Sequence, residues 1–285
     1  MKKCKIMLII LVAVMAFGML MYLTTVFVLK PYRNRVISDF INPVSIKSKE
    51  NFDLEAEYLN SSADSHKWVL LVHQYRCDHS SVKNLADVYA SNGYHVVIPD
   101  NRAHGHSGGR YIGMGYLDQE DLTLWIDYII KCDANATVII HGMSMGASAA
   151  MMLSDNTLPS NVKVIIEDSG YESAESYLRH KFEDRFHISS DFIVWIANYG
   201  FKLFAGYYMT DASAIAAVAN AKLPILFIHG EADKTVPIQH VYNLYYNCTS
   251  EKDLFVVPRA GHTEAVNIEK ENYWKQIFDF IEKHS

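Results

Sequence analysis

The chain of 285 residues has few cysteines and no excess of basic residues. Its four cysteines include no CxxC pair, which excludes a disulfide scaffold and leaves the redox compartment open. Lys and Arg number 26 against 32 Asp and Glu, and the resulting net charge of −6 argues against a nucleic-acid-binding protein. Internal repeats and low-complexity segments are also lacking. Half of the residues are hydrophobic, which excludes intrinsic disorder and is sufficient for a large core.

One long uncharged run lies at the N-terminus. Residues 6–29 carry no charge, and as a helix they would be roughly 36 Å long, enough to cross the hydrocarbon core of a bilayer. The alternative is a cleaved signal peptide, but the run exceeds an apolar signal region of about 7 to 15 residues and no small-x-small cleavage site follows it. We therefore predict that residues 1–29 form an N-terminal flank and a single-pass anchor in the cell membrane, followed by a juxtamembrane connector at 30–43.

Membrane sidedness is not set by the charges around this segment. Three lysines precede the run, and Lys30, Arg33 and Arg35 follow it, so the asymmetry of basic residues that orients a membrane helix is nearly absent. We favour an extracytoplasmic position for the soluble domain.

After residue 43, short apolar runs alternate with segments of helical periodicity. The runs are rich in Val, Ile and Leu and lack polar alternation, as expected for parallel strands covered on both faces. Alternation over more than 200 residues favours one doubly wound, mostly parallel α/β sheet in a single domain at 44–285. An aromatic-rich insertion at 171–223 interrupts the alternation, and such insertions commonly cover the site at the carboxyl ends of the strands. The predicted strands are 44–47, 54–58, 68–72, 94–98, 137–140, 162–166, 225–228 and 254–257, and the predicted helices are 82–90, 122–130, 147–153, 240–246 and 273–281.

Two segments match GxSxG, at 105–109 and 142–146. About 0.05 chance matches are expected in a chain of this composition, so the context must decide between them. Ser144 lies between a predicted strand and a predicted helix, where the flanking glycines permit a sharp turn that exposes the hydroxyl. The other match runs into a glycine-rich loop. We predict Ser144 to be a nucleophile.

A serine nucleophile needs an imidazole to accept its proton and a carboxylate to orient that imidazole. His262 follows the last predicted strand, and Asp233 follows the strand before it. Both therefore lie at the same edge of the sheet as Ser144, and their chain order matches the Ser, Asp, His order of one hydrolase architecture. Asp168, which ends another strand at that edge, remains the alternative carboxylate.

These residues resemble the α/β-hydrolase family, in particular membrane-anchored or secreted bacterial serine hydrolases of uncertain substrate. The resemblance covers nearly everything after residue 43. It implies an oxyanion hole formed by the backbone N–H groups of Met145 and Tyr75. Two positions depart from the family pattern, because Gln74 and Ala103 stand where glycine is usual. The motifs that carry the resemblance are Leu70-Leu-Val-His73, Pro99-Asp-Asn-Arg-Ala-His-Gly-His-Ser-Gly108, the Ser144 turn, Pro224-Ile-Leu-Phe-Ile-His-Gly230 with Asp233 and Pro237, and Gly261-His262.

Two further groups of residues invite a binding role. Phe192, Trp195 and Tyr199 in the insertion could line an acyl-binding wall, or they could cover apolar surface near the membrane. The histidines at 104 and 106 and the segment 77–79 suggest a metal site, but their spacing is not that of zinc ligands. We expect neither a metal nor a cofactor.

The sequence thus predicts a serine hydrolase of the carboxylesterase or lipase type, which cleaves a small acyl-containing substrate through an acyl-enzyme. A serine peptidase or amidase is one alternative, because the same triad cleaves amides. The other is a non-catalytic, membrane-tethered binding module with a hydrolase-like fold. The acyl length and the oligomeric state stay open.

Overall fold

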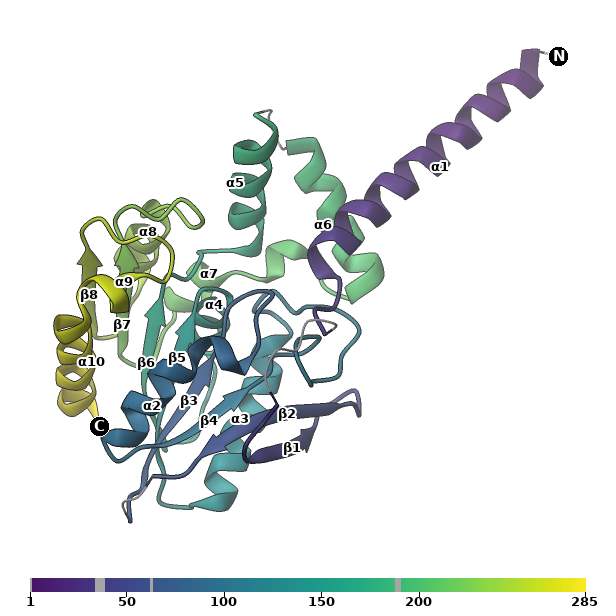
Figure 1. Ribbon diagram of the computed structural model, residues 1–285. Helices are drawn as coiled ribbons and strands as arrows, with labels where there is room; N and C mark the ends of the chain where they lie inside the picture. Colours follow the sequence, from purple (N-terminus) through teal and green to yellow (C-terminus); the bar gives the residue numbers. More distant parts are fainter. Residues whose placement is uncertain (1, 34–38, 62–63, 188–190) are drawn as a thin grey trace.

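The computed structural model describes residues 2–33, 39–61, 64–187 and 191–285 (Figure 1). Within these residues, eight strands form one sheet in the order β1-β2-β4-β3-β5-β6-β7-β8. β3 to β8 pair in parallel, whereas β1 and β2 run antiparallel at one edge. The predicted α/β-hydrolase sheet is confirmed. The strands are β1 Pro43–Lys47, β2 Asp53–Leu59, β3 Lys67–Val72, β4 His95–Pro99, β5 Thr137–Met143, β6 Val162–Asp168, β7 Ile225–Gly230 and β8 Lys252–Val257.

Helices cover both faces of this sheet. Alternate residues of the central strands are buried in two separate clusters, one beneath α2 and α10 and the other beneath α3, α4, α7 and α8. Parallel neighbours require such crossovers, which explains the continuous apolar runs of these strands. The helices are α1 Lys2–Leu29, η1 His79–Val82, α2 Lys83–Ser91, α3 Asp118–Cys132, α4 Met145–Met152, α5 Ala174–Phe186, α6 Asp191–Ala205, η2 Met209–Asp211, α7 Ala214–Val218, α8 Gln239–Asn247, α9 Ala265–Ile268 and α10 Lys270–His284.

The insertion at 171–223 has two parts. Its first two helices, α5 and α6, stand beyond the carboxyl ends of the strands (Figure 1). Its last helix, α7, instead packs against α4 and α8 and contributes Val218 to the core. Only α5 and α6 are therefore positioned to cover a site at this edge.

Helix α1 projects from the domain beside α6 (Figure 1). Its 25-residue segment Lys5–Leu29 is long and apolar enough to cross a membrane. Gly200 of α6 permits close approach of the two helices, because a Cβ there would collide with Thr25. The last turn of α1 belongs to the core, since Val28 and Leu29 are buried and the Leu29 carbonyl accepts a hydrogen bond from the Ile112 N–H at 3.0 Å. Part of the predicted connector, 34–38, lies outside the described residues.

A buried histidine links α2 and α10 on one face of the sheet, beneath the site. The Tyr273 hydroxyl donates to Asp168 (2.9 Å), so it can accept from Nε2 of His141 at 3.3 Å. The Tyr89 hydroxyl lies 3.0 Å from the other ring nitrogen. These contacts satisfy one neutral tautomer of His141, and burial lowers the pKa of this imidazole to about 3.

This neutral histidine makes stability sensitive to acid. Between its folded pKa of about 3 and its ordinary value of 6.5, the unfolded chain binds a proton that the native state excludes, so stability is lost as the pH falls through this window. We expect His141 to lower the free energy of unfolding of the wild type by about 2 kcal/mol when the pH falls from 7 to 5. Urea unfolding of the detergent-solubilised protein should show this loss relative to His141→Gln, which retains an amide but does not titrate. Parallel stability curves for the two proteins would contradict it.

Candidate active site

Ser144 lies at a sharp turn between β5 and α4. Its backbone has φ 54° and ψ −115°, a region that is strained for a residue with a side chain. The turn brings backbones together, so that a Cβ on Gly142 would collide with the backbone of Gly146, and a Cβ on Gly146 would collide with the carbonyl of Val72. The Ser144 N–H donates to the Asp168 carbonyl at 2.8 Å, which fixes the turn against β6. The glycines of GxSxG therefore let the chain adopt this geometry.

The structure brings together the three side chains predicted to form the triad. Nε2 of His262 lies 2.8 Å from Oγ of Ser144, and Nδ1 of His262 lies 2.6 Å from Oδ2 of Asp233. The three residues follow β5, β7 and β8, which belong to one parallel run of the sheet. Their loops meet because parallel strands end at the same edge.

Asp233 is held as an acceptor. Its Oδ1 accepts the N–H groups of Thr235 (2.7 Å) and Val236 (2.9 Å). Burial alone would raise the pKa of Asp233, but the hydrogen bonds from His262 and Val236 lower it below its ordinary value. An ionised carboxylate can only accept, so Nδ1 of His262 must donate to it and Nε2 is left to accept from the serine hydroxyl.

Asp168, the alternative carboxylate, has other partners. Its Oδ1 accepts from the Ser169 hydroxyl at 2.8 Å and its Oδ2 from the Tyr273 hydroxyl. Burial raises the pKa of Asp168 to about 6. The side chain is therefore bonded to the network beneath the site, and the position next to the His262 ring nitrogen is taken by Asp233.

Two backbone N–H groups are available for an oxyanion hole. Met145 is the first residue of α4, and Tyr75 lies in the loop after β3. Neither N–H has an acceptor among the described residues. The N-terminus of α4 adds a partial positive charge at the same point.

The two departures from glycine have different consequences. Gln74 has a negative φ, and its side-chain oxygen accepts from the Ser81 hydroxyl at 3.2 Å, so its backbone does not require glycine. Ala103 has φ 60°, the left-handed region in which glycine is favoured. Both backbone groups of Ala103 are nevertheless hydrogen-bonded, since its carbonyl accepts from the Tyr32 N–H and its N–H donates to the Gly108 carbonyl.

The histidines that suggested a metal site form a hydrogen-bonded cluster around Asp100. His79, Asp100 and His106 have potential ligand atoms within 4.8 Å of one another. Each carboxylate oxygen of Asp100 accepts one backbone N–H at 2.7 Å and one imidazole Nδ1 at 3.0 Å. Burial opposes ionisation of Asp100, but these hydrogen bonds lower its pKa below the ordinary value. The carboxylate thus orders the loop that follows β4. His104 lies apart, with Nδ1 2.9 Å from the Arg102 carbonyl.

The aromatic residues predicted as an acyl-binding wall lie on the outer face of α6. Phe192, Trp195 and Tyr199 are 60%, 50% and 47% exposed, and the Trp195 ring lies 6.1 Å from the ring of Phe17 in α1.

A pocket lies next to Tyr75, and its walls are formed by other residues. These walls were not predicted, although the spacing of four residues within 177–185 places apolar and basic side chains together on one face of a helix. The lining residues are Phe27, Val28, Tyr75, Arg76, Tyr177, Leu178, Lys181, Phe182 and Arg185.

Comparisons with known proteins agree with this fold. The model of the prolyl oligopeptidase family matches residues 80–285. The uncharacterised protein YqkD of Bacillus subtilis is 23% identical over 238 residues, which cover 83% of this chain and 78% of that protein. A solved esterase of Pyrococcus furiosus superposes with a TM-score of 0.72 at 19% identity, covering 89% of this chain and 98% of the other. The acylaminoacyl peptidase of Pyrococcus horikoshii gives 0.62 at 17% identity, covering 84% of this chain but 41% of that protein.

Proposed function

Because the chain belongs to the prolyl oligopeptidase family, whose fold here is that of the α/β-hydrolases, we propose that it is a serine hydrolase that cleaves carboxylic esters with Ser144, His262 and Asp233. The observation that carries this proposal is the continuous chain of hydrogen bonds from the hydroxyl through the imidazole to the carboxylate. The strained backbone of Ser144 supports it, because such strain is typical of nucleophile turns.

The reaction follows from these contacts. The Ser144 oxygen attacks the carbonyl carbon of the ester while His262 takes the hydroxyl proton. The N–H groups of Met145 and Tyr75 stabilise the negative charge that develops on the carbonyl oxygen. The C–O bond then breaks, and His262 returns the proton to the leaving alcohol. Water, deprotonated by the same imidazole, releases the acyl group as a carboxylic acid and restores the serine.

We also propose that α1 remains attached as a membrane anchor. A cleaved segment has no need of contacts with the mature domain, whereas Thr25, Val28 and Leu29 are buried against it. Loss of α1 would uncover the part of the core against which Val28 and Leu29 pack, and it would remove the acceptor of the Ile112 N–H. Sequencing the N-terminus of the purified protein tests this proposal, since cleavage after residue 29 would contradict it.

A peptidase or amidase is the second candidate, favoured by the family that the chain matches. The esterase from Pyrococcus furiosus is nevertheless covered almost completely by this chain, and the acylaminoacyl peptidase by less than half. We therefore rank ester cleavage first. Rates on a matched acyl p-nitrophenyl ester and acyl p-nitroanilide distinguish the two functions.

A fluorophosphonate probe tests the proposed nucleophile directly. We expect the detergent-solubilised protein to be labelled at Ser144, located by mass spectrometry of the modified peptide, and to release p-nitrophenol from short acyl esters. The probe mimics the tetrahedral intermediate and reacts only with an activated hydroxyl. A folded protein that is neither labelled nor active on these esters would contradict the hydrolase function.

A further inference from the structure

The pocket beside Tyr75 combines apolar walls with three cations. Its volume is about 460 Å³, and it lies between the end of α1, the loop after β3 and the helix α5. Phe27, Leu178 and Phe182 contribute apolar side chains, whereas Arg76, Lys181 and Arg185 carry the charge. No carboxylate is present among the described residues that line it. This composition fits an amphiphile with an apolar tail and an anionic head.

Two of the cations are available for a ligand. Lys181 and Arg185 are one helical turn apart on α5, and neither forms an ion pair or a side-chain hydrogen bond within the described part of the chain. Arg179 on the same helix differs, because Glu175 and Asp191 pair with it. Unpaired cations that line a pocket together favour a negatively charged partner.

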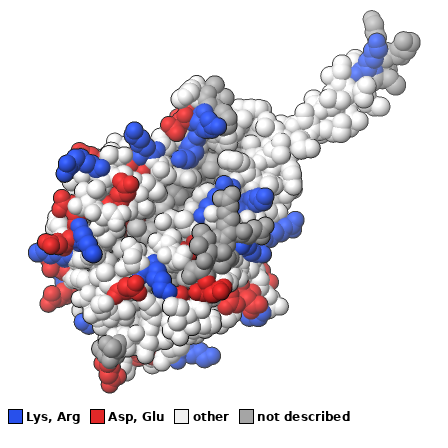
Figure 2. Space-filling model, in the orientation of Figure 1, with Lys and Arg blue, Asp and Glu red and all other residues white. Residues whose placement is uncertain are grey.

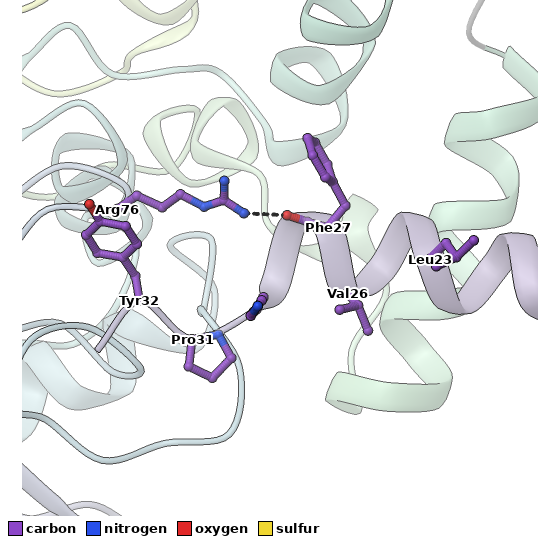
Figure 3. A pocket seen from close by; sticks show the side chains of 7 residues that line it. Leu23, Val26, Phe27, Pro31, Tyr32 and Arg76 are labelled. Carbon is purple, nitrogen blue, oxygen red and sulfur yellow. Dashed lines mark hydrogen bonds between the residues drawn. The ribbon is translucent and has the colours of Figure 1, made fainter. Parts of the chain in front are cut away.

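The anchor helix forms one wall of this pocket. The Tyr75 hydroxyl donates to the Val28 carbonyl at 2.6 Å, and Nη2 of Arg76 donates to the Phe27 carbonyl at 2.6 Å (Figure 3). Phe27 and Arg76 also line a second cavity along α1, of about 660 Å³, which is the one drawn in Figure 3. The loop that carries the proposed oxyanion donor is thus bonded directly to the last turn of the helix.

Apolar surface continues from α1 onto α6. Phe192, Trp195, Tyr199 and Leu203 are exposed on the outer face of α6, and Tyr22 of α1 lies 5.7 Å, ring to ring, from Phe204. Figure 2 shows that the projecting part of α1 bears no charge between its basic tip and the domain. Trp and Tyr beside an apolar helix are typical of the boundary between lipid and water. The pocket therefore lies next to the surface that would contact the bilayer.

We propose that the substrate is an anionic lipid of this membrane, which enters the pocket from the bilayer without passing through water. This proposal rests on the proposed ester hydrolysis and names its substrate class. The acyl chain lies along Phe27, Leu178 and Phe182, and the anionic headgroup pairs with Lys181 and Arg185. Ser144 attacks the ester carbonyl, the bond from that carbonyl to the glycerol oxygen breaks, and water yields a fatty acid and a lysolipid.

The test uses the full chain in vesicles of ether-linked phosphatidylcholine, which contains no carboxylic ester. A minor fraction of dioleoyl phosphatidylglycerol or dioleoyl phosphatidylcholine supplies the substrate, and released oleate is measured per fluorophosphonate-reactive enzyme. We expect phosphatidylglycerol to be cleaved at least about 10-fold faster, because charge-assisted hydrogen bonds contribute a difference of this order. Replacing both cations, Lys181→Gln with Arg185→Gln, should bring the ratio close to one.

The matched control removes two cations from the other end of the strands, where their amino termini lie. Lys131 lies near the end of α3, before β5, and Lys222 lies shortly before β7. Both side chains are exposed. The double variant Lys131→Gln with Lys222→Gln should retain the preference for phosphatidylglycerol. Equal rates on the two lipids, or a preference that survives the α5 double variant, would overturn the proposal.

Two further measurements test separately the two parts of the proposal, entry from the bilayer and the lipid substrate. If monomeric dihexanoyl phosphatidylglycerol in solution is cleaved as fast as the vesicle lipid, entry from the bilayer is wrong. If p-nitrophenyl butyrate is cleaved and neither lipid is, the lipid substrate is wrong and the hydrolase function stands. Absence of both labelling and p-nitrophenyl butyrate cleavage would instead refute the hydrolase function itself.

Discussion

Replacing Ser144 by alanine is expected to lower kcat on p-nitrophenyl esters by about 10⁴-fold or more, because removal of a nucleophile leaves only binding and the oxyanion hole to act. The variant should fold like the wild type, since only the side-chain oxygen is lost and the N–H that bonds the Asp168 carbonyl remains. Stopped assays over hours, with active-site labelling in parallel, measure the residual rate.

Ser107 provides the matched control, because it is the serine of the other GxSxG segment. Its hydroxyl donates to the Asp100 carbonyl at 2.5 Å and accepts from the Glu55 N–H at 2.9 Å. Ser107→Ala should therefore lower the free energy of unfolding by about 1 kcal/mol and leave fluorophosphonate labelling at Ser144. Retained turnover in Ser144→Ala would contradict the proposed nucleophile. If Ser144→Ala loses turnover but retains the biological activity of the protein in cells, a non-catalytic binding module would be favoured.

Asp233→Asn should have the second largest effect, a decrease in kcat of about 10⁴-fold. The amide N–H of asparagine can donate a hydrogen bond to Nδ1 of His262, which favours the tautomer whose proton is on Nε2 and faces the serine hydroxyl as a donor. The backbone bonds from Thr235 and Val236 can still be accepted by the amide oxygen, so the fold should persist. Steady-state kinetics with short acyl esters measure the change.

Asp168→Asn distinguishes the two carboxylates near His262. Asparagine can still accept the Tyr273 hydrogen bond, and the residue does not contact the imidazole nitrogens. We expect its kcat to stay within about 10-fold of the wild type, as for a neighbour that acts only through its charge. An equal loss in both variants would show that the orientation of His262 depends on both groups.

The residues of the candidate triad could be predicted because each lies in the loop or turn after a strand that the sequence identifies. Parallel strands end at one edge, so chain order and strand identity place Ser144, Asp233 and His262 together without any knowledge of side-chain packing. The choice between Asp233 and Asp168 could not be made from spacing. It depends on which carboxylate the Tyr273 hydroxyl of α10 occupies, and that residue is more than a hundred positions away from Asp168.

The pocket could not be predicted for a similar reason. Apolar residues in the insertion indicate coverage of something, but periodicity does not tell which face of α6 is turned toward the domain. Phe192 and Trp195 face outward because Val194, Ala197 and Phe201 are the residues buried on the opposite side. The contribution of Phe27 was hidden by its position in a run that composition identifies only as a membrane span.

The hydrogen bond from Tyr75 to the Val28 carbonyl has a practical consequence for handling the protein. A shortened chain that starts at residue 44 would be easier to keep in solution, but it would leave that phenol and the Arg76 guanidinium without their acceptors. The loop bearing Tyr75, the second proposed oxyanion donor, would then be less constrained. Slow turnover by such a fragment would therefore reflect the loosening of this loop as much as separation from the proposed lipid substrate.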